Sequence, residues 1–163
     1  DWQRRFLEPL SDEERLAGRA VVSWMAGKGE LFCTPHQAKP SLGVRVLDQQ
    51  GQRRYPLQLK ANGNVKVGID WLSRAGVAVG NEASQRAWAE RIGSIDGLAF
   101  RQAHPKGEMN MALPALVDSR IRGEFLAAMD GLVEAIEQGW AYRIPATEEA
   151  PPTKEAHAAQ EVE

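Results

Sequence analysis

The stretch that decides the fold runs from Ser41 to Leu72 and reads SLGVRVLDQQGQRRYPLQLKANGNVKVGIDWL. Its three alternating segments are separated by turn signals at Gln50-Gly51 and Asn62–Asn64, which predicts an antiparallel β-meander. Slipping the register by one residue would move every side chain to the other face, so the apolar pattern specifies the pairing strongly. The residues that this pattern assigns to the apolar face are Val44, Val46, Tyr55, Leu57, Leu59, Val67, Ile69 and Trp71.

The opposite face of this predicted meander is basic. Pairing outward from the Asn62–Asn64 turn sets Lys60 directly opposite Lys66, although like charges facing each other across strands are unfavourable. The positive charge is local, because residues 41–75 hold six Lys or Arg against two Asp whereas the whole chain carries a net charge of −2. Such a face is either a solvated surface or a prepared anion site. The candidate phosphate-binding residues are Arg45, Arg53, Arg54, Lys60 and Lys66.

Three helices are predicted around this meander. Residues 11–27 begin with Ser11 and Glu14 in a capping-box spacing and continue with an apolar stripe that includes Leu16. Residues 81–95 and 119–138 show apolar residues at helical spacing, and Gly139 is placed to end the last helix. Residues 109–113 are expected to add an edge strand. The predicted fold class is therefore α+β, an antiparallel β-meander of three to five strands packed on one face by about three helices.

Composition limits the cellular setting and the domain organisation. A single cysteine, Cys33, favours a reducing, cytoplasmic location, and no apolar run is long enough to span a membrane. Residues 1–143 are expected to form a single α+β domain, and the first residue, an Asp, suggests a fragment of a longer chain. Residues 144–163 hold five Glu against one Lys and no large apolar cluster, which predicts a disordered acidic tail.

The sequence contains two patterns that imitate catalytic or metal-binding sites. Asp48 followed by Gln58-Leu59-Lys60 imitates the acidic residues and lysine of metal-dependent nucleases, but the predicted register holds Asp48 and Lys60 at opposite ends of the strand pair. Cys33 and His36 have a spacing that zinc ligands can show, yet too few further ligands accompany them. The sequence therefore predicts no catalytic residue, no metal ligand and no cofactor.

The order of several segments resembles the C-terminal region of some uncharacterised bacterial proteins that carry a restriction-endonuclease-like portion upstream. The shared segments are the helix exit Trp24–Gly29, the Arg86, Trp88 and Ile92 spacing, Met109–Asp118 and Phe125–Asp130. The resemblance covers about Leu16 to Gln138. It implies an accessory domain beside a nucleic-acid-processing module, in phage or plasmid defence, and it brings no catalytic residue to this chain.

The function expected from these observations is that of a non-catalytic accessory or binding module of a larger bacterial protein, with nucleic-acid phosphates as its ligand. The expected partners are nucleic acid and an upstream catalytic domain or another protein, and no membrane. A protein–protein interaction or assembly domain is the alternative, and a small nuclease or hydrolase is the third interpretation. The residues favour a binding module over an enzyme.

Overall fold

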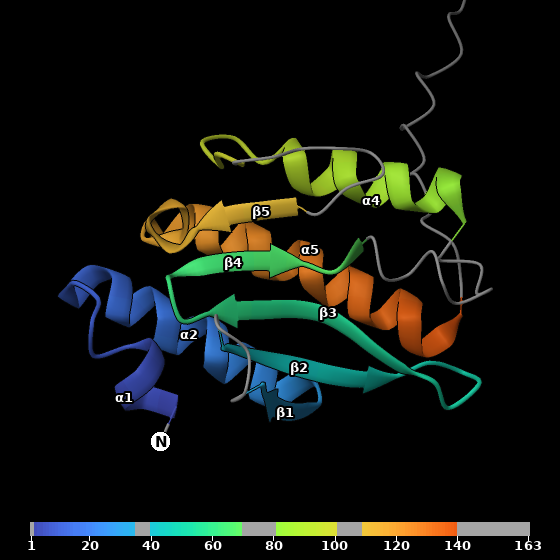
Figure 1. Cartoon of the computed structure of the whole chain (residues 1–163). Helices are drawn as coiled ribbons and strands as arrows, with labels where there is room; N and C mark the ends of the chain where they lie inside the picture. Colours follow the sequence, from blue (N-terminus) through green and yellow to red (C-terminus); the bar gives the residue numbers. More distant parts are fainter. Residues whose placement is uncertain (1, 35–39, 70–80, 101–108, 140–163) are drawn as a thin grey trace, which may run out of the picture.

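The computed structural model describes residues 2–34, 40–69, 81–100 and 109–139. Within these ranges five strands form one antiparallel sheet whose spatial order follows the chain, as an α+β fold built on a β-meander requires (Figure 1). The strands are β1 (Glu30–Cys33), β2 (Ser41–Leu47), β3 (Arg53–Lys60), β4 (Asn64–Val67) and β5 (Met109–Ala112). The predicted edge strand at residues 109–113 is β5, and the fold class is confirmed.

The two long helices α2 and α5 cover one face of this sheet. The helical segments are α1 (Trp2–Phe6), α2 (Asp12–Lys28), α4 (Glu82–Gly93), the 3-10 helix η2 (Leu113–Leu116) and α5 (Ser119–Gln138). In Figure 1, α2 and α5 lie behind the sheet and α4 lies beyond β5. We call the opposite face, turned to the viewer, the outer face; it carries Phe32, Arg45, Gln58, Lys60 and Lys66.

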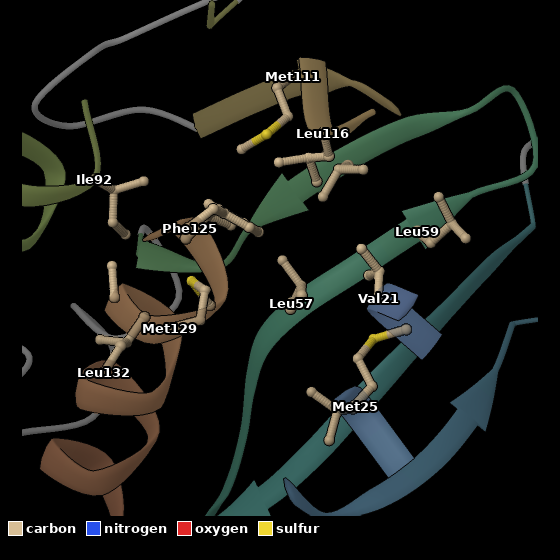
Figure 2. Close-up of a cluster of buried hydrophobic side chains, with 14 of the residues drawn as sticks. Val21, Met25, Leu57, Leu59, Ile92, Met111, Leu116, Phe125, Met129 and Leu132 are labelled. Carbon is tan, nitrogen blue, oxygen red and sulfur yellow. The ribbon is translucent and has the colours of Figure 1, made fainter. Parts of the chain in front are cut away.

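The hydrophobic core fills the space between the sheet and the two long helices (Figure 2). Val21 and Met25 of α2 lie on one side of Leu57 on β3, and Phe125 and Met129 of α5 lie on the other. Each of these side chains is almost fully buried, and burying one such side chain contributes about 1.5–3 kcal/mol. The core therefore occupies the face of the sheet toward α2 and α5, and the outer face is the candidate binding surface.

The helix ends follow the sequence signals. Ser11 Oγ accepts a hydrogen bond from the Glu14 N–H, and the Glu14 carboxylate accepts one from the Ser11 N–H, which completes the predicted capping box. Gly139 ends α5 with a φ of 67°, a left-handed conformation that suits glycine. The prediction that Leu16 belongs to the apolar stripe of this helix was wrong, because its side chain is exposed while Ala17, Val21 and Met25 face the core.

The short helix α1 was not predicted, since its five residues are too few to show a helical period. The predictions for Trp71 and residues 144–163 lie outside the described residues. No helix in the described ranges has the length and apolar character that crossing a membrane requires.

Candidate binding face of the sheet

One row of side chains crosses all five strands on the outer face. Strand pairing sets Phe32 beside Gly43, Gly43 beside Gln58, Gln58 beside Lys66, and Lys66 beside Asn110. Gln58, Lys66 and Asn110 are all buried despite their polarity. Buried polar groups are ordinarily hydrogen-bonded, so this row is an ordered polar layer rather than a loose solvent-facing one.

The predicted pairing of Lys60 with Lys66 was wrong. Lys66 lies opposite Gln58, and Lys60 lies opposite Ser41 on β2. The hairpin loop comprises Ala61, Asn62 and Gly63, and Gly63 has a φ of 76°. A three-residue loop commonly ends in such a left-handed residue, so the loop begins one residue earlier than predicted. The register shifts by two residues, and Lys60 and Lys66 keep the face that the sequence assigned to them.

Lys66 is not an exposed cation. Only 4% of its surface is accessible, and the amide side chains of Gln58 and Asn110 occupy the neighbouring positions of the same row. On β4 the nearby Asn64 donates a side-chain N–H to Asn110 Oδ1 at 3.0 Å. Lys66 therefore belongs to the buried polar layer, and it is poorly placed to meet a phosphate from solvent.

A β-bulge moves Tyr55 to the outer face. Val44 pairs with Leu57 and Val46 pairs with Arg54, so Tyr55 and Pro56 together oppose the single residue Arg45. Proline has no N–H to give to a sheet ladder and is found at bulges and edges. The prediction that Tyr55 lies on the apolar face was therefore wrong, and the Tyr55-Pro56 pair was the sequence signal that could have revealed the bulge.

Tyr55 meets Phe32 on this face. Their ring centroids are 5.0 Å apart and their planes make an angle of 70°, an edge-to-face contact. Gly43 lies beneath the Phe32 ring: a β-carbon at Gly43 would come within 2.7 Å of Phe32 and 3.0 Å of the Gln58 side chain. The absence of a side chain at Gly43 is what lets Phe32 on the edge strand lie over the next strand.

Arg45 is engaged by an acid on the edge strand. Its guanidinium binds the Glu30 carboxylate through Nε at 3.1 Å and through Nη2. The pKa of Arg45 is raised, chiefly by the hydrogen bond to Glu30, and Tyr55 contributes in the same direction. Arg45 thus stays charged beside Tyr55, with Glu30 as a largely exposed partner.

At the tip of the β2–β3 hairpin, Arg54 is held by a buried carboxylate. The Asp48 side chain is 0% exposed and that of Arg54 is 12% exposed. Arg54 donates to Asp48 Oδ2 from Nε at 3.0 Å and from Nη2 at 2.8 Å, and the Gln50 and Gln52 N–H groups donate to Oδ1. Both carboxylate oxygens are therefore used to close the turn, and Arg54 is a structural residue.

Of the remaining two predicted cations, Arg53 is exposed and Lys60 is partly exposed. Both lie on β3, Lys60 at its end and Arg53 at its start, and neither forms an ion pair within the described residues. Leu47, which pairs with Arg53, leaves 57% of its surface exposed beside it. Of the five predicted phosphate contacts, Arg53 and Lys60 are therefore open, Arg45 is shared with Glu30, and Arg54 and Lys66 are enclosed.

The strand register does not bring together the residues of the nuclease-like pattern. Asp48 follows Leu47, which pairs with Arg53, whereas Lys60 pairs with Ser41 at the other end of the same strands. Within the described ranges, no three His, Cys, Asp or Glu side chains come together as metal ligands would. Cys33 is an exposed thiol on β1, and His36, the second residue of the zinc-like spacing, lies outside the described residues.

Comparisons with known proteins add no relative from which a site could be transferred. No family model, no curated protein and no solved structure matches this chain.

Proposed function

We propose that the chain is a non-catalytic binding module of a larger cytoplasmic bacterial protein, and that its outer face contacts nucleic-acid phosphates. The observation that carries the proposal is the pair Arg53 and Lys60, two accessible cations on β3 without an ion-pair partner in the described residues. Arg45 lies on the same face, where its guanidinium is paired with the Glu30 carboxylate, so a phosphate would have to share it with Glu30. Neither α2 nor α5 lies on this face (Figure 1), and Arg53 and Lys60 stand at the two ends of β3, on either side of the buried Gln58.

The test is a binding titration with a fluorescent oligonucleotide at low salt, followed by anisotropy. The double variant Arg53→Glu/Lys60→Glu reverses both accessible charges. If each side chain meets one phosphate, the slope of log affinity against log salt concentration should fall by about one for each lost contact. Affinity at about 50 mM salt should fall at least tenfold.

A matched control separates local contact from net charge. Arg19→Glu/Arg91→Glu makes the same charge change at exposed positions on α2 and α4, away from the outer face. This control should keep most of the affinity. Equal losses in the two double variants would show that only the overall charge matters and would overturn the proposed face.

A second candidate is a protein-interaction or assembly domain, favoured by the exposed Leu47 and by the open edge strand β1. It becomes the better account if the wild-type chain binds no oligonucleotide at low salt. Light scattering over a range of protein concentrations would then show self-association, which Leu47→Asp should weaken.

A further inference from the structure

The aromatic pair on the outer face is not explained by phosphate binding. Phe32 and Tyr55 come from β1 and β3, and both leave part of their surface accessible. Large apolar side chains on the polar face of a sheet gain less from burial than those in the core. Their position, separated from the core by the sheet itself, points to a contact with something outside the domain.

The residues around the aromatic pair have the chemistry that a nucleotide-binding surface uses. Phe32 lies over Gly43, where no side chain separates its ring from β2. Arg45 lies beside Tyr55, and Lys60 follows Gln58 by two residues on the same face of β3. An aromatic surface with cations at its border offers stacking to a base and charge to the adjoining phosphates.

We propose that Phe32 and Tyr55 form a stacking platform for unpaired bases, so that the nucleic acid bound by this face is single-stranded. This inference rests on the proposed function and gives it a substrate class. In a duplex the faces of the bases are covered by their neighbours, whereas a single strand can turn them toward an aromatic ring. Arg53 and Lys60 are also too few positive charges to hold a duplex by phosphate contacts alone. Base stacking therefore supplies the part of the binding free energy that charge does not.

The experiment compares three ligands on the wild-type chain. They are a single strand of about 12 nucleotides, a duplex of the same length, and an abasic strand that keeps the sugar and phosphates but lacks the bases. The single strand should bind at least tenfold more tightly than either of the other two. Because no substitution is involved, this comparison does not depend on a variant folding.

The possible outcomes separate this inference from the function on which it rests. If all three ligands bind equally well, phosphate contact stands and the stacking platform is overturned. If the duplex binds most tightly, the single-strand assignment is overturned. If none of them binds at low salt, both proposals fail.

Two substitutions locate the platform. Phe32→Ala and Tyr55→Ala should each lower the affinity for the single strand by about fivefold to a hundredfold and leave the affinity for the abasic strand nearly unchanged. Leu16→Ala, at an exposed apolar position on α2 away from the outer face, is the matched control and should change neither affinity. Equal losses for the single strand and the abasic strand in the aromatic variants would overturn the assignment of these two rings.

Discussion

Trp24 on α2 donates its indole N–H to Asp130 Oδ1 on α5 across 2.8 Å, and Lys28 Nζ lies 2.7 Å from the same oxygen. The Asp130 carboxylate thus joins the two helices that cover the sheet, although Trp24 and Asp130 are 106 residues apart in the chain. Lys28 also lies over the Trp24 ring, 5.9 Å from its centroid. These contacts to Asp130 hold α2 and α5 together as the helical layer that supports the sheet from behind.

Replacing Asp130 should therefore loosen the helical layer. We expect Asp130→Ala to lower the free energy of unfolding by about 1 kcal/mol, since both partners can still reach water. Urea denaturation measures the change. Glu137→Ala, at an exposed position on the same helix, is the control and should shift the midpoint little. Identical midpoints for the two variants would contradict the role given to Asp130.

The Asp48–Arg54 pair gives a sharper stability prediction. Arg54→Ala leaves the fully enclosed Asp48 carboxylate without its charged partner, and it should lower the free energy of unfolding by about 3 kcal/mol. Arg53→Ala changes the neighbouring accessible residue and should cost less than about 0.5 kcal/mol. Equal effects of the two substitutions would show that the turn does not rely on the buried pair.

The same carboxylate predicts a pH dependence. Burial would raise the pKa of Asp48, but hydrogen bonds from the Gln52 backbone, Arg54 and the Gln50 backbone outweigh it, and the pKa is lowered. A lowered folded-state pKa stabilises the protein above the unfolded pKa of about 3.9, and this stabilisation is lost as the pH falls through the folded pKa. Asp48→Asn should therefore flatten the acid side of a plot of unfolding free energy against pH. An acid side as steep as that of the wild type would contradict the assignment.

Gly43 tests the packing of the outer face. Gly43→Ala forces a β-carbon against the Phe32 ring and should destabilise the fold by about 1–2 kcal/mol. Adding Phe32→Leu should recover part of this loss, because the smaller side chain can move away from the new methyl group. Thermal unfolding of the single and double variants measures the coupling. Strictly additive effects would show that the two positions are not in contact.

Two glycines of α5 form a matched pair. A β-carbon at Gly123 would have no neighbour within 4 Å, so Gly123→Ala should stabilise the protein by about 0.5–1 kcal/mol through its helix propensity. At Gly131 the same β-carbon would lie 3.1 Å from the Trp88 ring on α4, so Gly131→Ala should gain less or lose stability. Equal gains at both positions would mean that Trp88 does not pack tightly there.

The helices and the two faces of the sheet could be predicted because they depend on local periodicity. Residues 119–138 show the apolar spacing of a core-facing helix, and α5 has those bounds. The register was harder, since the choice between the Asn62–Asn64 and Ala61–Gly63 loops depends on which residue takes the left-handed conformation. Shifting a three-residue loop by one residue keeps every side chain on its face, so the faces predicted for Leu57, Leu59 and Val67 were right although their pairing was not, and only the bulge moved Tyr55.

The candidate site was predicted less well than the fold. A count of basic residues on β2, β3 and β4 cannot show that Asp48 encloses Arg54 or that Lys66 lies in a buried polar row. Those facts depend on contacts between strands and on the bulge at Tyr55 and Pro56. The same bulge brings Tyr55 to Phe32, a meeting that strict alternation along β3 excludes.

The most direct test of the account is an amide chemical-shift titration of the labelled chain with a single-stranded oligonucleotide at low salt. We predict that the shifts of Phe32, Gln58 and Lys60 change in a saturable way, while those of the helical layer, such as Val21 and Met129, stay nearly constant. Changes confined to α2 and α5, or no change at any residue, would contradict the claim that the outer face of the sheet binds nucleic acid.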